Sequence, residues 1–308
     1  MNVGEALSFG RRLLAGKSDT PARDAGLLLS FVLGEPSEFV YLHPEAPVSE
    51  GLFAQYSGLL DRRASGEPVA YIRGFHEFMG HTFLVDPRVL IPRPETEHVV
   101  EAAAQLLTKT SSPIVADICC GSGAIGLSIA KALPLSRVVL SDVSREAVDL
   151  ARENAKRLGL SHRVSFLVGD LVAPLLAAGL RGRLDLVTAN PPYIPTEEID
   201  TLSPTVRDFE PRLALDGGES GLEMIRRISK EVPAVLKPGG YLVMEIGADQ
   251  GEACRDIMME DREYWAGTEV RRDYAGRQRV VVARTHGTGC PKRVVGRSGV
   301  HGDEDCQG

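Results

Sequence analysis

Apolar residues follow two different periods along the chain, and the period changes near residue 113. Before that point they recur at helical spacing in three stretches, which predicts amphipathic helices over 2–15, 21–34 and 49–66. After it, short apolar runs alternate with helical patterns, which is typical of a parallel sheet with helices on its faces. We therefore predict a small helical bundle followed by a larger α/β domain.

Between these regions the pattern predicts a β-hairpin and then a helix. Val69–Ile72 and Thr82–Val85 have strand composition and are joined by a connection that contains glycine. Two prolines in Ile91–Glu97 fix an extended segment, and an amphipathic helix is expected from Glu95 to Leu107. We expect this segment to lie across the mouth of a binding site, with Arg93 and Glu95 facing the substrate.

The larger domain has six predicted strands, which are Ile114–Ile118, Arg137–Asp142, Val164–Asp170, Leu184–Thr188, Tyr241–Ile246 and Val280–Ala283. A helix is expected over Glu223–Leu236, followed by a turn at 238–240. The predicted domains are a helical bundle (1–65), a hairpin linker (66–94), an α/β domain (95–284) and a polar, glycine-rich tail (285–308) for which we expect disorder.

Composition limits the classes of function. The chain has 308 residues, 43% of them hydrophobic, and a formal net charge of −7, which disfavours a protein that holds DNA mainly through phosphate contacts. No apolar run approaches the roughly 18 residues of a membrane span, and the N-terminus does not resemble a secretory signal. Five cysteines, an odd number, favour a reducing cytoplasm over a disulfide framework.

A glycine-rich turn follows the first buried strand. Cys119-Cys120-Gly121-Ser122-Gly123 leads into a helix that reaches Leu133, and Asp142 ends the next strand 21 residues after Gly121. This spacing matches the nucleotide-binding pattern in which glycines allow close approach of the ligand and a later acid takes the ribose hydroxyls. Both NAD and S-adenosylmethionine are bound in this way.

Two features favour S-adenosylmethionine as the cofactor. Asp117, just before the loop, suits a cationic ligand and would repel a pyrophosphate. Asp170 and Leu171 follow the third strand and are candidates for the adenine edge and face. These acids share the carboxyl ends of the strands, where such sheets bind their ligands.

The candidate catalytic stretch is Asn190-Pro191-Pro192-Tyr193, at the end of the strand Leu184–Thr188. The Asn190 oxygen and the Pro191 carbonyl can each accept one N–H of a planar amino group, whose lone pair then faces an electrophile. Tyr193 can stack on that planar group, and Pro192 stiffens the turn. Holding a weak nucleophile in line is catalysis by positioning, so the stretch predicts alkylation of an amide or an exocyclic base amine.

No metal site is expected. His76 and His81 flank four residues, one more than the His-Glu-x-x-His zinc motif allows, and Gly80 disfavours a helix there. Cys290 and Cys306 also lack the spacing of paired cysteine ligands.

Taken together, these motifs resemble the PrmC/HemK family, the protein-(glutamine-N5) methyltransferases of peptide chain release factors. The resemblance covers roughly residues 1–284. It is carried by Gly66–Gly74, Ile91–Glu97, Asp117–Ile125, Asn190–Tyr193 and the segment Phe209-Glu210-Pro211-x-x-Ala214-Leu215-x-Gly217-Gly218. Of these, Pro92–Glu97 is much more specific than Asn190–Tyr193, which adenine and cytosine amino-methyltransferases share.

The resemblance implies a Rossmann-like methyltransferase domain preceded by a helical domain and a hairpin linker. It implies S-adenosylmethionine binding by Cys119 to Gly123, Asp142, Leu171 and Asn190. The glutamine of the release factor's Gly-Gly-Gln motif would be held by Asn190 to Tyr193. A cytoplasmic monomer without membrane or direct nucleic-acid contacts is expected. The chain departs from the family at Cys119-Cys120, where smaller residues are usual, and at Leu171, where an aromatic residue is usual.

Four alternatives remain open on sequence grounds. They are a DNA adenine amino-methyltransferase, a glutamine methyltransferase of a ribosomal protein, a non-catalytic binding protein and a dehydrogenase. The acidic balance and the short insertion after Tyr193 disfavour the first, and intact Asn190–Tyr193 disfavours the third.

Overall fold

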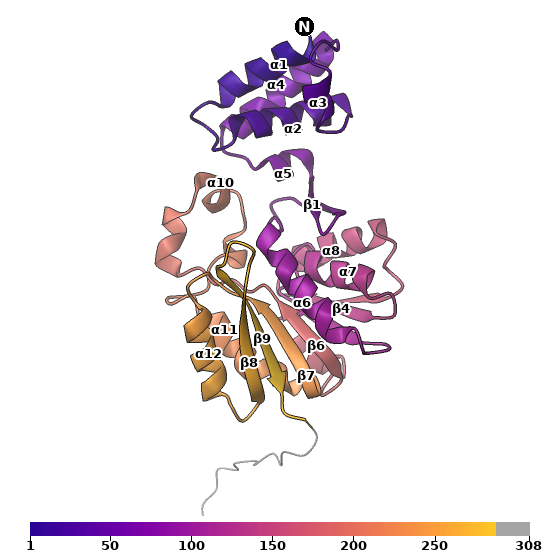
Figure 1. Cartoon of the computed structure of the whole chain (residues 1–308), viewed down its shortest axis with the longest axis vertical. Coiled ribbons are helices and arrows are strands. Elements are labelled where there is room, and N and C mark those ends of the chain that lie inside the picture. The colour runs from indigo at the N-terminus through magenta and orange to yellow at the C-terminus, as the bar shows by residue number, and fades with distance from the viewer. Residues whose placement is uncertain (288–308) are drawn as a thin grey trace, which may run out of the picture.

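The N-terminal part of the chain is a bundle of four helices. The structure, a computed structural model, describes residues 1–287. The bundle helices are α1 (Val3–Leu14), α2 (Pro21–Leu33), α3 (Phe39–Leu42) and α4 (Glu50–Ala64). Their apolar faces share one core that includes Leu28, Tyr56 and Leu60. Figure 1 shows this bundle at one end of the molecule, joined to the rest through α5.

The connection after the bundle differs from the sequence prediction. Val69–Ile72, predicted as a strand, lies in the short helix α5 (Val69–Arg73), which starts after Pro68 and ends at Gly74 in a left-handed conformation. In this helix Tyr71 and Ile72 pack into two different apolar clusters, one beside the α/β domain and one in the bundle. The hairpin is present, but its strands are β1 (Phe75–Phe78) and β2 (His81–Leu84).

The hairpin packs on the α/β domain. Phe78 and Phe83 lie in the same apolar cluster as residues of α6 (Glu97–Leu107), which follows the 3-10 turn η1 (Pro94–Thr96). At the hairpin tip the Met79 N–H donates to Glu97 Oε1 over 2.7 Å. The segment predicted as a linker therefore contributes to the core of the larger domain.

A seven-stranded sheet forms the larger domain. Its strands are β3 (Ile114–Ile118), β4 (Arg137–Asp142), β5 (Val164–Val168), β6 (Leu184–Ala189), β7 (Leu236–Glu245), β8 (Trp265–Arg272) and β9 (Gln278–Thr285). Their order is β5-β4-β3-β6-β7-β9-β8. Strand β9 is antiparallel to both neighbours, and the other pairs are parallel. This arrangement confirms the predicted Rossmann-like class.

Helices pack on both faces of the sheet because buried parallel strands are apolar on both sides. One core cluster joins the sheet to α6, α7 (Ala124–Ala132) and α8 (Arg145–Arg157). The other joins it to α9 (Ala173–Ala177), α11 (Glu223–Glu231) and α12 (Gly251–Glu260). The remaining short elements are η2 (Thr196–Thr201), α10 (Pro204–Arg207), η3 (Arg212–Ala214) and η4 (Val232–Ala234).

Several boundaries differ from the prediction. The predicted turn at 238–240 lies inside β7, which starts at Leu236 rather than Tyr241, and β5 ends at Val168 rather than Asp170. The helix predicted over Glu223–Leu236 ends at Glu231, because Pro233 has no N–H to continue it. Strand β8 was not predicted. Thr285, placed in the tail by the prediction, belongs to β9 and donates to the Lys237 carbonyl over 2.9 Å. The rest of the predicted tail from residue 288 on, with Cys290 and Cys306, lies outside the described residues.

Within residues 1–287 there is no helix both long and apolar enough to cross a membrane. The same residues contain no group of three or more His, Cys, Asp or Glu side chains that could hold a metal ion.

Candidate active site

The sheet reverses its strand order at the boundary between β3 and β6. The chain leaves β3 toward β4 and β5, then returns to β6 on the other side of β3. Sheets of this kind bind their ligands at such a switch point, beyond the carboxyl ends of the strands. Ile118 pairs with Ala189 in the register of β3 and β6. The next residues, Cys119 and Asn190, therefore begin their two loops side by side.

Two glycines after β3, Gly121 and Gly126, each lack a side chain for a different structural reason. Gly121 has a φ of 51°, and a Cβ built on it would meet nothing within 4 Å, which leaves space for a ligand against the backbone. A Cβ on Gly126 would lie 2.3 Å from Leu140 Cδ2, so a side chain there would push α7 away from β4. The loop is thus open on one side and tightly packed on the other.

Asp142 fixes the loop to the neighbouring strand. Its Oδ2 accepts the Gly121 N–H and its Oδ1 accepts the Ser144 N–H, each over 2.9 Å. Burial raises the pKa of this carboxyl, while the N–H donors oppose the change. The next side chain, Val143, is 52% exposed. An acceptor for hydroxyl groups and an exposed apolar surface therefore adjoin each other at the end of β4.

Asp117 lies beneath the loop. It is fully buried, with Oδ2 accepting the Gly126 N–H over 3.0 Å and Oδ1 accepting the Thr188 hydroxyl over 2.9 Å. Burial raises the pKa of Asp117 to about 7. Both oxygens hold protein groups of α7 and β6, so this geometry supports the loop from below. Direct contact between Asp117 and a cofactor stays a prediction.

Asp117 makes the stability of the fold depend on pH. Because its pKa is higher in the folded protein than in the unfolded chain, its contribution is complete below about pH 4 and is lost as the pH rises through about 7. Between pH 5 and 8 the unfolding free energy of the protein should fall by about 2–3 kcal/mol relative to Asp117→Asn.

Urea unfolding at pH 5, 6.5 and 8 would measure this difference. The matched control is Asp208→Asn, because the pKa of the exposed Asp208 is lowered by Arg207 and this group does not titrate in that range. A difference between the protein and Asp117→Asn that stays constant from pH 5 to 8 would contradict the expectation.

Asp170 and Leu171 lie on the turn after β5. Asp170 is exposed and its Oδ2 accepts from the Arg227 guanidinium on α11 over 2.7 Å. Leu171 is buried and has a φ of 43°, and Cys119 has a φ of 54°. Such left-handed conformations are costly for side chains other than glycine and gather at functional sites. The two departures from the family pattern thus coincide with strained backbone.

The thiols of Cys119 and Cys120 are uncharged in this setting. Burial raises the pKa of both, and the carboxylates of Asp142 and Asp117 raise it further. Both cysteines are free. They therefore pack as neutral groups in the loop.

The Asn190–Tyr193 turn is held at its Tyr193 end by two hydrogen bonds. Pro191 and Pro192 are buried. The Tyr193 hydroxyl donates to Glu245 Oε1 over 3.1 Å, and the Tyr193 carbonyl accepts from Gln250 Nε2 over 2.9 Å. The turn is thereby anchored to the end of β7 and the start of α12.

Thr96 links this turn to the segment before α6. The Asn190 Nδ2 group donates to Thr96 Oγ1 over 3.4 Å. Glu245, which is 1% exposed, has its pKa raised by burial, and the Thr96 and Tyr193 hydroxyls act in the opposite direction. Because the Asn190 amino group faces Thr96, its oxygen is left to accept from a substrate.

Removing the Thr96 hydroxyl should slow turnover. Thr96→Val keeps the shape of the side chain but removes the acceptor that orients Asn190, and we expect kcat to fall about tenfold with cofactor affinity unchanged. The matched control is Thr108→Val at the other end of α6, where the hydroxyl donates only to the Gln105 carbonyl over 3.0 Å. Steady-state kinetics and calorimetric cofactor binding check this, and an unchanged kcat would contradict it.

Arg93 and Glu95 occupy different positions. Arg93 donates to Glu210 Oε1 over 2.6 Å, and the Glu210 side chain is buried. Burial raises the pKa of Glu210, and Arg93 opposes this. Glu95 is exposed beside Thr96. A substrate contact of either residue stays a prediction.

The structure therefore brings most of the predicted residues to one place. Asp117, Cys119 to Gly123, Asp142 and Asn190 adjoin the switch point, while Asp170 is engaged by Arg227. Sequence reasoning missed Thr96, Glu245 and Val143 as site residues. Glu245 carries the signal already used for Asp142, an acid at the carboxyl end of a parallel strand.

A strand-reversal site that joins this glycine-rich loop to the Asn190–Tyr193 turn is typical of an S-adenosylmethionine-dependent methyltransferase. Residues 5–74 match the family described as PrmC N-terminal domain, and residues 97–208 match the family described as methyltransferase small domain.

Named relatives extend over most of the chain. A release factor glutamine methyltransferase of Moorella thermoacetica is 45% identical over 91% of this chain and 96% of its own length. A release factor glutamine methyltransferase of Koribacter versatilis is 40% identical over 89% of this chain and 95% of its own length. A solved protein-(glutamine-N5) methyltransferase, release factor-specific, of Alicyclobacillus acidocaldarius shares 26% identity with a TM-score of 0.40, covering 66% of this chain and 99% of that one. The chain belongs to the release factor glutamine methyltransferase family.

Proposed function

We propose that this methyltransferase transfers a methyl group from S-adenosylmethionine to the side-chain amide nitrogen of the glutamine in the Gly-Gly-Gln motif of release factors. The observation that carries the proposal is the position of Asn190 beside the cofactor loop, with its amino group engaged by Thr96. Identity of 40–45% with relatives named for this activity supports the same substrate.

The chain's own residues supply positioning rather than acid or base chemistry. Asn190 Oδ1 and the Pro191 carbonyl each accept one N–H of the substrate amide, which directs the nitrogen lone pair toward the methyl carbon. Tyr193 packs against the planar amide, held in place by Glu245 and Gln250. Aligning the two reacting atoms is the main source of rate in such a site.

S-adenosylmethionine supplies a methyl group on a positively charged sulfur, which keeps the electron pair of the breaking C–S bond. The protein fits such a group, since the Gly121 backbone is open and Asp142 retains acceptor capacity for ribose hydroxyls. Cys119, Cys120, Ser122 and Gly123 complete that loop. The adenine would contact Val143 and the Asp170-Leu171 turn. After methyl transfer the cationic amide nitrogen loses a proton and becomes neutral.

The helical bundle is proposed as the docking platform for the release factor, with Arg93 and Glu95 beside the entering loop. We expect the enzyme to act as a monomer in the cytoplasm and to recognise protein without contacting nucleic acid. The net charge of −7 supports this choice of partner.

Transfer of radiolabelled methyl from S-adenosylmethionine to three acceptors tests the proposal. The acceptors are a purified release factor, a ribosomal protein preparation and duplex DNA containing adenine. Label in the release factor alone is expected. Label in DNA with none in the release factor would overturn the assigned substrate and retain the cofactor.

A further inference from the structure

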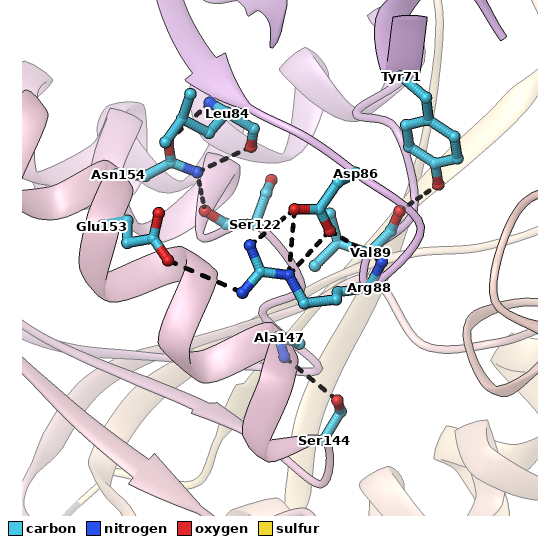
Figure 2. Close-up of polar contacts among 10 residues, drawn as sticks. All are labelled: Tyr71, Leu84, Asp86, Arg88, Val89, Ser122, Ser144, Ala147, Glu153 and Asn154. Carbon is cyan, nitrogen blue, oxygen red and sulfur yellow. Dashed lines mark hydrogen bonds and ion pairs between the residues drawn. The ribbon is translucent and has the colours of Figure 1, made fainter. Parts of the chain in front are cut away.

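Asn154 joins two segments that are distant in sequence. It lies on α8, is fully buried, and uses its whole carboxamide. Its Oδ1 accepts the Leu84 N–H over 2.7 Å, and its Nδ2 donates to the Leu84 carbonyl over 3.1 Å and to the Ser122 carbonyl over 2.9 Å. Figure 2 shows this carboxamide between the hairpin and the loop. Both amino hydrogens and the oxygen are therefore engaged.

At Leu84 the Asn154 carboxamide forms the pair of backbone hydrogen bonds that a neighbouring strand would otherwise form. Leu84 is the last residue of β2, and Asn154 pairs with both its N–H and its carbonyl. Nearby, Arg88 pairs with Asp86 over 2.6 Å and approaches Glu153 over 3.7 Å, but these contacts are partly exposed (Figure 2). The buried polar link between the hairpin and α8 is thus the Asn154 side chain, beside the apolar contacts of Phe78 and Phe83.

At Ser122 the same carboxamide touches the cofactor loop. Ser122 is buried between Gly121 and Gly123, both of which have a left-handed backbone. A buried carbonyl without a donor is unfavourable, so the loop conformation depends on the Nδ2 group. A shift of the hairpin relative to α8 would therefore disturb the backbone that faces the cofactor.

The hairpin is in turn attached to the helical bundle. Ile72 of α5, just before β1, packs in the bundle core. The Tyr71 hydroxyl donates to the Val89 carbonyl over 2.5 Å just after β2 (Figure 2). Helix α5 therefore connects the bundle core to the segments on both sides of the hairpin.

We propose that Asn154 is a positioning residue that couples the hairpin to the cofactor loop. Cofactor binding then stabilises the hairpin. A protein docked on the bundle changes the affinity for the cofactor by the same factor as the cofactor changes the affinity for that protein, as linkage requires. The second part rests on the proposed function, whereas the first concerns the enzyme and its cofactor alone.

Hydrogen exchange tests the first part in the unaltered enzyme. Addition of S-adenosylhomocysteine should slow exchange in the peptide that covers residues 81–85, because the Leu84 N–H is bound to Asn154. The effect should be absent in Asn154→Asp, in which a carboxylate oxygen replaces the donor and faces two carbonyls. It should persist in the matched control Glu153→Gln, which alters the adjacent exposed contact only.

Binding measurements give a second readout. S-adenosylhomocysteine should bind Asn154→Asp about tenfold more weakly than it binds the unaltered enzyme and Glu153→Gln. With saturating release factor, its affinity should shift in the unaltered enzyme by about fivefold or more and stay within about twofold in Asn154→Asp.

The outcomes separate the two proposals. Unchanged hairpin exchange on cofactor binding to the unaltered enzyme would overturn the inference even if Asn154→Asp failed to fold. Equal protection in Asn154→Asp and the unaltered enzyme would also overturn it. Slower hairpin exchange together with an unmethylated release factor would support the coupling and count against the proposed substrate.

Discussion

Asn190→Ala should lose almost all turnover while its binding of S-adenosylmethionine stays detectable. The side chain touches the protein through its Nδ2 contact with Thr96, so its removal leaves the loop at Gly121 and Asp142 intact. The substrate amide would lose one of two acceptors that orient its nitrogen. We expect kcat to fall about 10³-fold, with cofactor binding still measurable.

Asn190→Asp distinguishes the role of the side-chain oxygen from that of the amino group. It keeps an oxygen that can accept the substrate N–H, but it cannot donate to Thr96 and it brings a negative charge near Glu245. An activity between those of the unaltered enzyme and Asn190→Ala is expected. Single-turnover methyl transfer measures the catalytic rate, and isothermal calorimetry measures cofactor binding. Normal turnover in Asn190→Ala would rule out the assigned role.

Gly217→Ala should be almost as damaging, although residue 217 carries no chemistry. A Cβ at this position would lie 2.7 Å from Tyr193 Cα and 2.9 Å from the Pro192 carbonyl oxygen. Both contacts are with backbone, which must move by several tenths of an ångström. Gly217 N–H also donates to the Ile194 carbonyl over 2.8 Å, so the added methyl is held against the turn. We expect kcat to fall about 10²-fold through misplacement of the substrate amide.

Gly58→Ala on α4 is the matched control. A Cβ there meets nothing within 4 Å, and alanine favours a helix. It should leave kcat unchanged. Cofactor affinity should stay close to that of the unaltered enzyme in both variants, whereas the midpoint of thermal unfolding should fall only in Gly217→Ala, where backbone must shift. Full activity in a folded Gly217→Ala enzyme would mean that the turn tolerates displacement.

The central strands were predictable from sequence because a buried parallel strand is apolar on both faces. Ile114–Ile118 and Arg137–Asp142 have the predicted bounds, and the loop between them follows from glycine spacing. Edge strand β8 was missed because it is largely exposed and carries several charges. Its place depends on pairing with β9, which comes later in the chain.

Val69–Ile72 shows why local composition failed next to the hairpin. Its residues suit a strand, but α5 must bury Tyr71 on the α/β domain and Ile72 in the bundle. Adjacent side chains on a helix point in different directions, so Tyr71 and Ile72 can enter two separate cores. The choice is made by tertiary packing that no local pattern records.

The site residues that belong to local motifs were predictable, whereas those placed by contacts between distant segments were not. Asn190, Gly121 and Asp142 were found from motif spacing and strand ends. Thr96 lies 94 residues from its hydrogen-bond partner Asn190, and Glu245 lies 52 residues from its partner Tyr193. Asn154 is further hidden, since a helical asparagine has no distinctive pattern. Such partners become visible only when the strands are placed in order.

Mass spectrometry of a release factor tests the proposed activity most directly. The factor is incubated with the enzyme and S-adenosylmethionine, its intact mass is measured, and the peptide bearing the Gly-Gly-Gln motif is sequenced. One added methyl group on that glutamine is predicted, and none with Asn190→Ala. An unmodified glutamine, or a methyl group on another residue, in the presence of cofactor-binding enzyme would contradict the assignment of Asn190–Tyr193 as a glutamine-holding turn.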